Sequence, residues 1–192
     1  MGTCSSSEKF TNTIRVVAPA RQNNEQNTPE ETAIFQRINP ALNNLKEVDH
    51  KSIFSQEGYC GIESIRVRSG SYIVGLQVCY NVNLEPKIAD LMGSGPYQND
   101  QLISFAEDEY IDMMTLYYDD VAIAGIEILT TSEKRHFIGN QHNRCYIKET
   151  DLRGKERIVV GFRGLVGELL SDLGIYHAEV DLADVLPTRV LD

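Results

Sequence analysis

From Gly58 onward the chain consists of short apolar runs separated by turn residues, and this pattern limits the fold more than any other feature. In residues 72–80 apolar and polar side chains alternate, as they do in a strand with one buried face. Similar runs lie at residues 62–67, 102–105, 110–118, 121–129, 136–138, 145–148, 157–162 and 174–180. Many short strands with turns at regular spacing predict an all-β sandwich, barrel or prism. Periodicity alone does not choose among the three.

The charged residues between the runs fit strand ends and turns. We interpret Glu107-Asp108-Glu109 as a solvated strand end and Asp119-Asp120 as a tight hairpin turn. No Asp-x-Asp-x-Asp-Gly spacing supports a calcium loop. Nothing in the sequence places the two acidic clusters face to face, as a hydrolytic pair of carboxylates would require.

Residues 1–50 have a different composition. Residues 1–28 are rich in Ser, Thr, Asn and Gln, so they predict a flexible arm. Thr28-Pro29-Glu30-Glu31 is a capping box with proline at the first helical position, and Asn39-Pro40 repeats the start signal. Apolar residues follow each signal at helical spacing, namely Ile34, Phe35 and Ile38, then Leu42, Leu45 and Val48. They predict two short amphipathic helices, which are too small to fold alone.

We therefore divide the chain into three segments. Residues 1–50 form a polar arm with two short helices, residues 51–181 form the main domain, and residues 182–192 form a tail. The arm is expected to dock on the main domain or on a partner.

Charge excludes some partners. The chain has 192 residues, a formal net charge of −10 and no cluster of Lys and Arg. Nucleic-acid binding is not expected, because neutralising phosphates needs a basic face. The same charge opposes docking on anionic lipid. No stretch approaches the roughly 20 apolar residues that span a bilayer, and the first residues lack the apolar core of a secretory signal. We expect a cytoplasmic protein.

The first six residues, Met1-Gly2-Thr3-Cys4-Ser5-Ser6, match the N-myristoylation pattern M-G-x-x-x-[ST]. Cys4 is a candidate for palmitoylation beside a myristoylated Gly2. Two lipid chains would be needed for stable anchoring, because one myristoyl chain binds membranes only marginally. The alternative is an unmodified Ser-rich start. With both lipids, the domain would lie at the cytosolic face of a membrane.

Four widely spaced cysteines are present, with no C-x-x-C. Cys60 and Cys79 lie in apolar runs and predict buried free thiols, which suits a reducing compartment, whereas a disulfide between them is the less favoured alternative. His136, His142 and Cys145 lack a fourth ligand at zinc-like spacing. No G-x-S-x-G elbow is present. We predict no metal, no cofactor and no catalytic residues.

Several stretches share their order and spacing with one known family. They are GIESIRVRSG (61–70), the strand ending in Cys79-Tyr80, DEYIDMMTLYY (108–118), VAIAGIEILTTSEKRHFIG (121–139) and IVVGFRGLVGELLSDLGIYHAEV (158–180). Within them are Glu109-Tyr110-Ile111, a strand ending in Thr130-Thr131, and Gly161-Phe162-Arg163-Gly164. In these motifs the chain resembles the jacalin-related lectins. The resemblance implies a β-prism I fold of three four-stranded antiparallel sheets.

The resemblance also implies a site. Sugar-binding members hold hydroxyls with an early glycine-bearing loop and a late G-x-x-x-D loop, whose carboxylate accepts strong hydrogen bonds. The late loop here is Gly167-Glu168-Leu169-Leu170-Ser171, with Ser171 at the Asp position. Asp172 is one residue too late, where strand alternation points it elsewhere. The early loop, residues 49–52, contains no glycine. Tyr117 corresponds to a loop aromatic that stacks on sugar in some members.

Two functions remain open, and neither is enzymatic. In the first, the domain is a carbohydrate-binding module with an altered site formed by Gly167, Glu168, Leu169, Ser171 and Tyr117, together with the loop around Lys51. In the second, the β-prism is a structural or scaffold subunit that uses the arm and the tail for contacts with protein partners, with or without a lipid anchor.

Overall fold

The computed structural model describes residues 45–141, 146–155 and 157–179. These residues form strands and one short helix, α2. The elements are β1 (Lys46–Asp49), α2 (Lys51–Phe54), β2 (Tyr59–Ser69), β3 (Ile73–Val82), β4 (Glu85–Ile88), β5 (Asn99–Ser104), β6 (Ile111–Tyr118), β7 (Ile123–Thr130), β8 (Arg135–Gly139), β9 (Tyr146–Asp151), β10 (Arg157–Val166) and β11 (Leu170–Glu179). The described part of the chain contains no helix that is long and apolar enough to cross a membrane.

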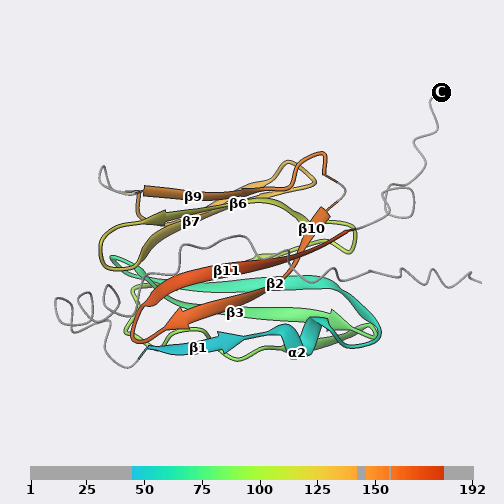
Figure 1. The fold of residues 1–192 in the computed structure, drawn as a ribbon, viewed down its shortest axis with the longest axis horizontal. Helices are drawn as coiled ribbons and strands as arrows, with labels where there is room; N and C mark the ends of the chain where they lie inside the picture. Colours follow the sequence, from blue (N-terminus) through green and yellow to red (C-terminus); the bar gives the residue numbers. More distant parts are fainter. Residues whose placement is uncertain (1–44, 142–145, 156, 180–192) are drawn as a thin grey trace, which may run out of the picture.

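The strands form three antiparallel sheets. Sheet A has the order β1-β10-β11, sheet B the order β4-β3-β2-β5, and sheet C the order β8-β7-β6-β9. The prediction of an all-β fold with three antiparallel sheets is confirmed. Sheets B and C have four strands each, whereas sheet A has three strands within the described residues. Figure 1 shows the strands of all three sheets lying roughly along one common axis, as the strands on the faces of a prism do.

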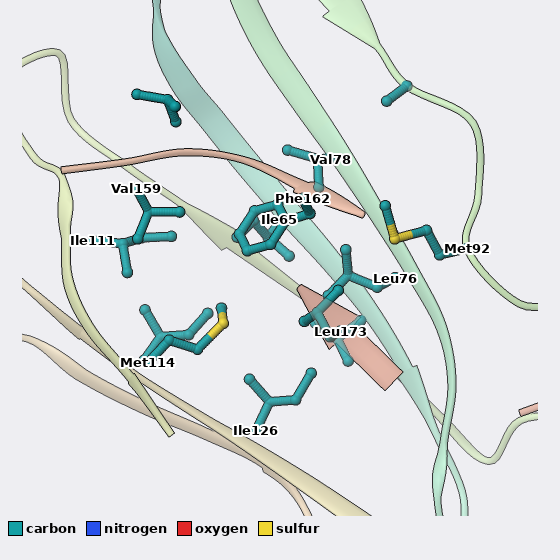
Figure 2. Close-up of a cluster of buried hydrophobic side chains, with 14 of the residues drawn as sticks. Ile65, Leu76, Val78, Met92, Ile111, Met114, Ile126, Val159, Phe162 and Leu173 are labelled. Atoms are coloured by element: carbon teal, nitrogen blue, oxygen red, sulfur yellow. The ribbon is translucent and has the colours of Figure 1, made fainter. Parts of the chain in front are cut away.

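One hydrophobic core fills the space between the sheets. Figure 2 shows buried side chains from each sheet pointing toward one another. The labelled residues are Ile65, Leu76 and Val78 of sheet B, Met92 of the loop between β4 and β5, Ile111, Met114 and Ile126 of sheet C, and Val159, Phe162 and Leu173 of sheet A. Each sheet therefore buries one face, which is why the strands alternate in sequence.

The prism has two distinct ends. The turn between β10 and β11 lies at one end, which we call the hairpin end, and α2 lies at the other, the helix end (Figure 1). Strand register places the end of β2, the start of β5, the end of β6 and the start of β9 at the hairpin end, since Ser69 pairs with Asn99 and Tyr118 with Tyr146. Loops from all three sheets therefore meet at the hairpin end.

The predicted second helix is wrong over its last residues, because Lys46–Asp49 form strand β1. Val48 pairs with Gly164 of β10 and is 8% exposed. A short helix has little stability of its own, whereas pairing with β10 provides both hydrogen bonds and burial. The first predicted helix, the rest of the arm and the tail from residue 180 lie outside the described residues.

The Gly161-Phe162-Arg163-Gly164 motif is explained by packing. Phe162 is fully buried. A Cβ at Gly161 would lie 2.2 Å from Cδ1 of Phe54, and a Cβ at Gly164 would lie 2.8 Å from Sδ of Met92. Gly161 is therefore required by the Phe54 ring that presses against the β10 main chain, whereas at Gly164 the flexible Met92 side chain would have to shift.

Glu109 is buried, which corrects the prediction that it forms part of a solvated strand end. Its Oε1 accepts hydrogen bonds from Thr130 Oγ1 at 2.7 Å and from Ser132 Oγ. Its Oε2 accepts from Lys134 Nζ at 2.9 Å and from the main-chain N–H of Ala106 at 3.2 Å. This carboxylate therefore joins the start of β6 to the β7–β8 turn.

The Asp119-Asp120 segment forms the predicted turn. Asp119 Oδ1 accepts hydrogen bonds from the N–H groups of Val121, at 2.8 Å, and Ala122, at 3.2 Å. These bonds are typical of an aspartate that begins a turn, and they fix the short link between β6 and β7.

Cys60 and Cys79 are free thiols, as predicted, but both are partly exposed rather than buried. The register of β2 and β3 places Cys79 opposite Ser64. Burial, together with the nearby Glu63 carboxylate, raises the pKa of the Cys79 thiol. Its thiolate form is therefore disfavoured. Cys4 and Cys145 lie outside the described residues.

Candidate functional site

The turn between β10 and β11 brings together three residues predicted for the site, Gly167, Glu168 and Leu169. The N–H of Gly167 donates to the carbonyl of Leu169 at 3.0 Å, which closes the turn. Within the described residues, the N–H groups of Glu168 and Leu169 make no hydrogen bond to another part of the protein. Two adjacent unpaired N–H groups in a turn can hold a hydroxyl or carboxylate oxygen of a ligand.

Ser171, the fourth predicted residue, lies in β11 and not in the turn. Its Oγ is buried and has no hydrogen-bond partner among the described residues. A buried, unpaired hydroxyl costs about 1–3 kcal/mol. Ser171 is therefore next to the turn in sequence, and it is partly buried with its Oγ shielded from solvent.

Tyr117, the fifth predicted residue, lies within β6 and is 6% exposed, so it is not a loop aromatic. Its Oη donates to Glu127 Oε2 at 2.7 Å. This hydrogen bond, together with burial, raises the pKa of Tyr117 to about 12. Its ring packs edge-on against Phe137 of β8. The contacts of the Tyr117 side chain described above are therefore all within sheet C.

The next residue, Tyr118, reaches toward sheet A instead. Its Oη donates to Asp172 Oδ1 at 2.7 Å, and Lys148 Nζ lies 3.4 Å from the same oxygen. Burial and the Asp172 carboxylate raise the pKa of Tyr118, so it remains a neutral donor. The Asp172 side chain is half-exposed. As strand alternation predicted, Asp172 points away from the direction of Ser171.

Tyr146, the first residue of β9, extends this group. Its ring is stacked on that of Tyr118, with centroids 6.5 Å apart and planes at 12°, and Tyr146 is 58% exposed. Its Oη donates to Asp120 Oδ1 at 3.3 Å. We call Tyr118, Tyr146, Asp120, Lys148 and Asp172 the tyrosine–aspartate cluster. It offers an exposed aromatic ring beside two carboxylates.

The loop that carries Gly93 and Gly95 supports the hairpin from the side of sheet B. The N–H of Gly95 donates to the carbonyl of Glu168 at 2.9 Å, and Ser94 Oγ donates to the carbonyl of Gly167 at 3.4 Å. A Cβ at Gly95 would lie 2.4 Å from that Glu168 oxygen. This loop is therefore a support for the candidate site, and it requires glycine at position 95.

Gly95→Ala is expected to displace the hairpin and to lower the free energy of unfolding by about 1–3 kcal/mol, because the added methyl group meets main-chain atoms. Amide chemical shifts of residues 167–169 and urea denaturation measure both effects. Gly70→Ala is the matched control, since nothing lies within 4 Å of a Cβ there. Unchanged shifts at 167–169 in Gly95→Ala would contradict the close approach.

The early loop, Asp49–Ser52, lies far from the hairpin. In the β1–β10 register Lys46 pairs with Val166 beside the turn, whereas Asp49 pairs with Arg163 toward the helix end. Lys51 begins α2. The expectation that the loop around Lys51 joins the late loop is therefore wrong, because β1 runs away from the hairpin.

His50 serves the fold in this segment. It is 2% exposed, and its ring nitrogens lie 3.0 Å from Tyr80 Oη and 3.0 Å from the carbonyl oxygen of Asp90. Burial lowers the pKa of His50. These contacts tie the end of β1 to sheet B.

The groups at the hairpin end are suited to hydrogen bonding with polar, uncharged ligand groups. In residues 45–141, 146–155 and 157–179, no group of three or more His, Cys, Asp or Glu side chains could hold a metal ion. His142 and Cys145 lie outside those residues. The hairpin offers N–H donors, and the tyrosine–aspartate cluster offers carboxylate acceptors beside an aromatic ring. This combination suits hydroxyl groups on a ring with an apolar face.

Comparison with protein families identifies the class of protein. The model of the jacalin-like lectin domain matches residues 48–176, which is more than half of the chain. The chain belongs to this family of lectin domains, as the resemblance of its motifs indicated. No curated protein sequence was found to match it.

Solved structures show the same fold. The artocarpin–mannotriose complex has a TM-score of 0.56 and 18% identity, covering 69% of this chain and 89% of artocarpin. Frutapin from Artocarpus incisa has a TM-score of 0.58 and 20% identity, covering 70% and 89%. Wild-type Malaysian banana lectin has a TM-score of 0.57 and 18% identity, covering 71% and 91%. At such identities the likeness concerns the fold.

Proposed function

We propose that this domain is a carbohydrate-binding module whose site lies at the hairpin end, next to the tyrosine–aspartate cluster. The observation that carries the proposal is the pair of N–H groups at Glu168 and Leu169, which make no hydrogen bond within the described residues. Such donors can bind sugar hydroxyls without a charged side chain. The family match and the sugar complex of artocarpin, a protein of the same fold, support this choice.

The proposed site is an altered one, because Ser171 stands where the family resemblance places an Asp. A hydrogen bond to a charged group contributes about 1.5–3 kcal/mol, which corresponds to about 10- to 100-fold in affinity. We infer that Gly167, Glu168 and Leu169 contribute main-chain contacts, and that Tyr146 and Asp172 replace Tyr117 and the missing carboxylate. Weak binding that depends on several simultaneous contacts is the expected behaviour.

A glycan-array screen of the purified full chain, followed by calorimetry with methyl α-mannoside and methyl α-galactoside, tests this function. Saturable binding that is lost in Tyr146→Ala and kept in Tyr97→Ala would support the proposed site, because Tyr97 is an exposed tyrosine that contacts Arg68 of sheet B and is not part of the tyrosine–aspartate cluster. Binding that is unaffected by Tyr146→Ala would place the site elsewhere, and silence across the array would contradict carbohydrate binding.

Ser171→Asp is expected to raise affinity for one of these glycosides about tenfold or more, because it restores a charged acceptor beside the hairpin. Ser171→Asn is the matched control, since it adds similar volume without charge. Because the Oγ is buried, some loss of stability is also expected. A folded Ser171→Asp variant with no gain over Ser171→Asn would refute the idea that the missing carboxylate limits binding.

A scaffold role is the second candidate, and exposed apolar residues on edge strands favour it. Ile88 of β4 is 70% exposed, Leu102 of β5 is 57% exposed and Ile147 of β9 is 60% exposed. Apolar residues at an open sheet edge suit contacts with a protein partner. We propose that the N-terminal arm and the tail add to such contacts. A lectin-negative chain that co-purifies with a defined partner and loses it in Ile88→Lys would favour this function.

Anchoring at the cytosolic face of a membrane remains a proposal based on Gly2 and Cys4, which lie outside the described residues. Intact-mass analysis of the protein from its native source tests it directly. A mass that includes a myristoyl group, with or without a palmitoyl group, would support anchoring. The unmodified mass would contradict it.

A further inference from the structure

The outer face of sheet B carries large exposed apolar side chains near both of its edges. The buried side chains of β2 and β3 point into the core, so the alternate ones point outward. Strand register places Ile88 of β4 beside Cys79, and Leu102 of β5 beside Arg66, on this outer face. Ile88 is 70% exposed and Leu102 is 57% exposed. Exposed apolar residues gathered on one sheet face indicate a contact surface.

The charges on this face are unevenly placed. Arg66 and Arg68 both lie 3.5 Å from the single carboxylate of Asp100, and the side chain of Arg66 is 44% exposed. A second carboxylate, that of Glu63, lies nearer the helix end, with its Oε2 3.8 Å from the Cys79 Sγ. The part of the face around Arg66 therefore has an excess of positive charge, and it suits an acidic partner.

The N-terminal arm joins the domain beside this face. It leads into β1, an edge strand of sheet A that starts at Lys46. His50, which follows β1, lies 3.0 Å from the carbonyl oxygen of Asp90, just after β4 (Figure 1). The arm therefore enters at the corner between sheets A and B, on the side of β4. Residues 39–44 allow at most about 23 Å between residues 38 and 45, which is enough to bring residue 38 onto sheet B.

The sequence of the arm fits the face. The capping box at residues 28–31 and the spacing of Ile34 and Ile38 predict a short amphipathic helix over residues 29–38. Glu30 and Glu31 lie three or four residues before Ile34, so they share its side of the helix. The predicted helix thus has a stripe that is acidic at its start and apolar at its end.

The dimensions of the helix and the sheet also agree. An α-helix rises 1.5 Å per residue, so Glu30 and Ile38 would be about 12 Å apart. In the strand register Ile88 and Arg66 lie two strands and two residues apart, which is about 12 Å in a sheet of ordinary spacing. Because the arm enters on the side of β4, Ile38 would meet Ile88 and the acidic start would meet Arg66. Cys79 would lie beneath the middle of the helix.

The other two sheets suit this helix less well. The outer face of sheet A carries Glu47, Asp49 and Asp172 with one arginine, Arg163, as the register shows. These carboxylates would repel the acidic start of the helix. Sheet C lies opposite the corner where the arm enters, so residues 39–44 would have to pass round another sheet to reach it.

We propose that residues 29–38 dock as an amphipathic helix on the outer face of sheet B, with Ile38 against Ile88 and the acidic start against Arg66. The inference does not depend on carbohydrate binding. It gives the exposed apolar residues of β4 and β5 an occupant from the same chain. A protein partner that binds this face would then have to displace the arm.

Alkylation of Cys79 by N-ethylmaleimide, followed by peptide mass spectrometry of the full chain, tests the proposal. A docked helix would cover this thiol, which is partly exposed in the described structure. A chain carrying Ile34→Asp and Ile38→Asp should react at Cys79 about tenfold faster or more, which corresponds to a loss of about 1.4 kcal/mol of docking free energy. The matched control carries Val16→Asp and Val17→Asp, which add the same charge to the arm outside the predicted helix, and it should react like the wild type.

A charge exchange tests the expected orientation. Arg66→Glu should also speed alkylation of Cys79, and adding Glu30→Arg and Glu31→Arg to that variant should slow it again. Equal rates in the wild type and in the Ile34→Asp, Ile38→Asp chain would overturn the proposal. Protection that is lost on dilution and ignores the arm variants would also overturn it, and would assign the face to a second copy of the chain. Failure of the charge exchange would overturn the placement of the acidic start at Arg66.

Discussion

Replacing Phe54 with alanine is expected to lower the free energy of unfolding by about 3–5 kcal/mol, the usual cost of removing a buried phenylalanine. Phe54 is 1% exposed, although it belongs to a four-residue helix at the helix end. Its ring centroid lies 5.0 Å from that of Tyr176 and 6.4 Å from that of Tyr59. The ring thus joins sheets A and B. Urea denaturation of both proteins measures the loss.

Urea denaturation of three further variants can show whether the loss in Phe54→Ala comes from the packing of its ring. Ser52→Ala in the same helix is the control and should change stability by no more than about 0.5 kcal/mol. Gly161→Ala alone should cost about 1–3 kcal/mol, because its Cβ would press on the Phe54 ring. In the Phe54→Ala background this cost should largely disappear. Additive losses in the double variant would mean that the ring does not lie against Gly161.

The sequence predicted the fold well because strands with one buried face leave a period of two in the sequence. The alternation in residues 72–80 predicted β3, and residues 110–118 predicted β6 almost to its ends. Two edge strands left no such signal. Lys46–Asp49 buries only Val48, and Glu85–Ile88 contains a proline and buries nothing. Short strands at sheet edges are held by their neighbours rather than by their own pattern.

The candidate site was harder to predict, because it depends on which end of the prism each loop reaches. Gly167, Glu168 and Leu169 lie together in a turn between two clear strands, and their role in binding stays a prediction. The early loop was placed wrongly because the β1–β10 register cannot be read from the sequence. Tyr117 was predicted as a loop aromatic, but it lies within β6 and is buried, whereas the next side chain, that of Tyr118, reaches toward sheet A.

Tyr146 shows a further limit. It begins a strand that was expected from residue 145, and nothing local marks its ring as exposed beside Tyr118. The acidic turn Asp119-Asp120, whose Asp120 contacts Tyr146, was a usable signal, because binding residues are often found on loops held by a rigid scaffold.

Glu109→Gln is expected to remove the acid sensitivity that this carboxylate gives to the fold. Burial by itself raises the pKa of Glu109, but hydrogen bonds from Ser132, Thr130, Lys134 and the Ala106 N–H outweigh it and hold the pKa at about 2. The ordinary value is 4.5. Above pH 4.5 the carboxylate is charged in both the folded and the unfolded chain, so its full stabilisation is present. As the pH falls toward 2, the unfolded chain takes up the proton first and stability is lost.

Urea denaturation at neutral pH and at several values between pH 4.5 and 2 measures this loss. At neutral pH the glutamine variant should be less stable by about 1.5–3 kcal/mol, because charge-assisted hydrogen bonds become neutral ones. Its stability should then fall less steeply with acid than that of the wild type. Glu107→Gln is the matched control at an exposed neighbouring position and should follow the wild type. Parallel acid profiles for Glu109→Gln and the wild type would show that the buried carboxylate does not join the Glu109-Tyr110-Ile111 motif to the Thr130-Thr131 motif. The family pattern would then need another physical reason, because these two motifs meet at Glu109 in the structure.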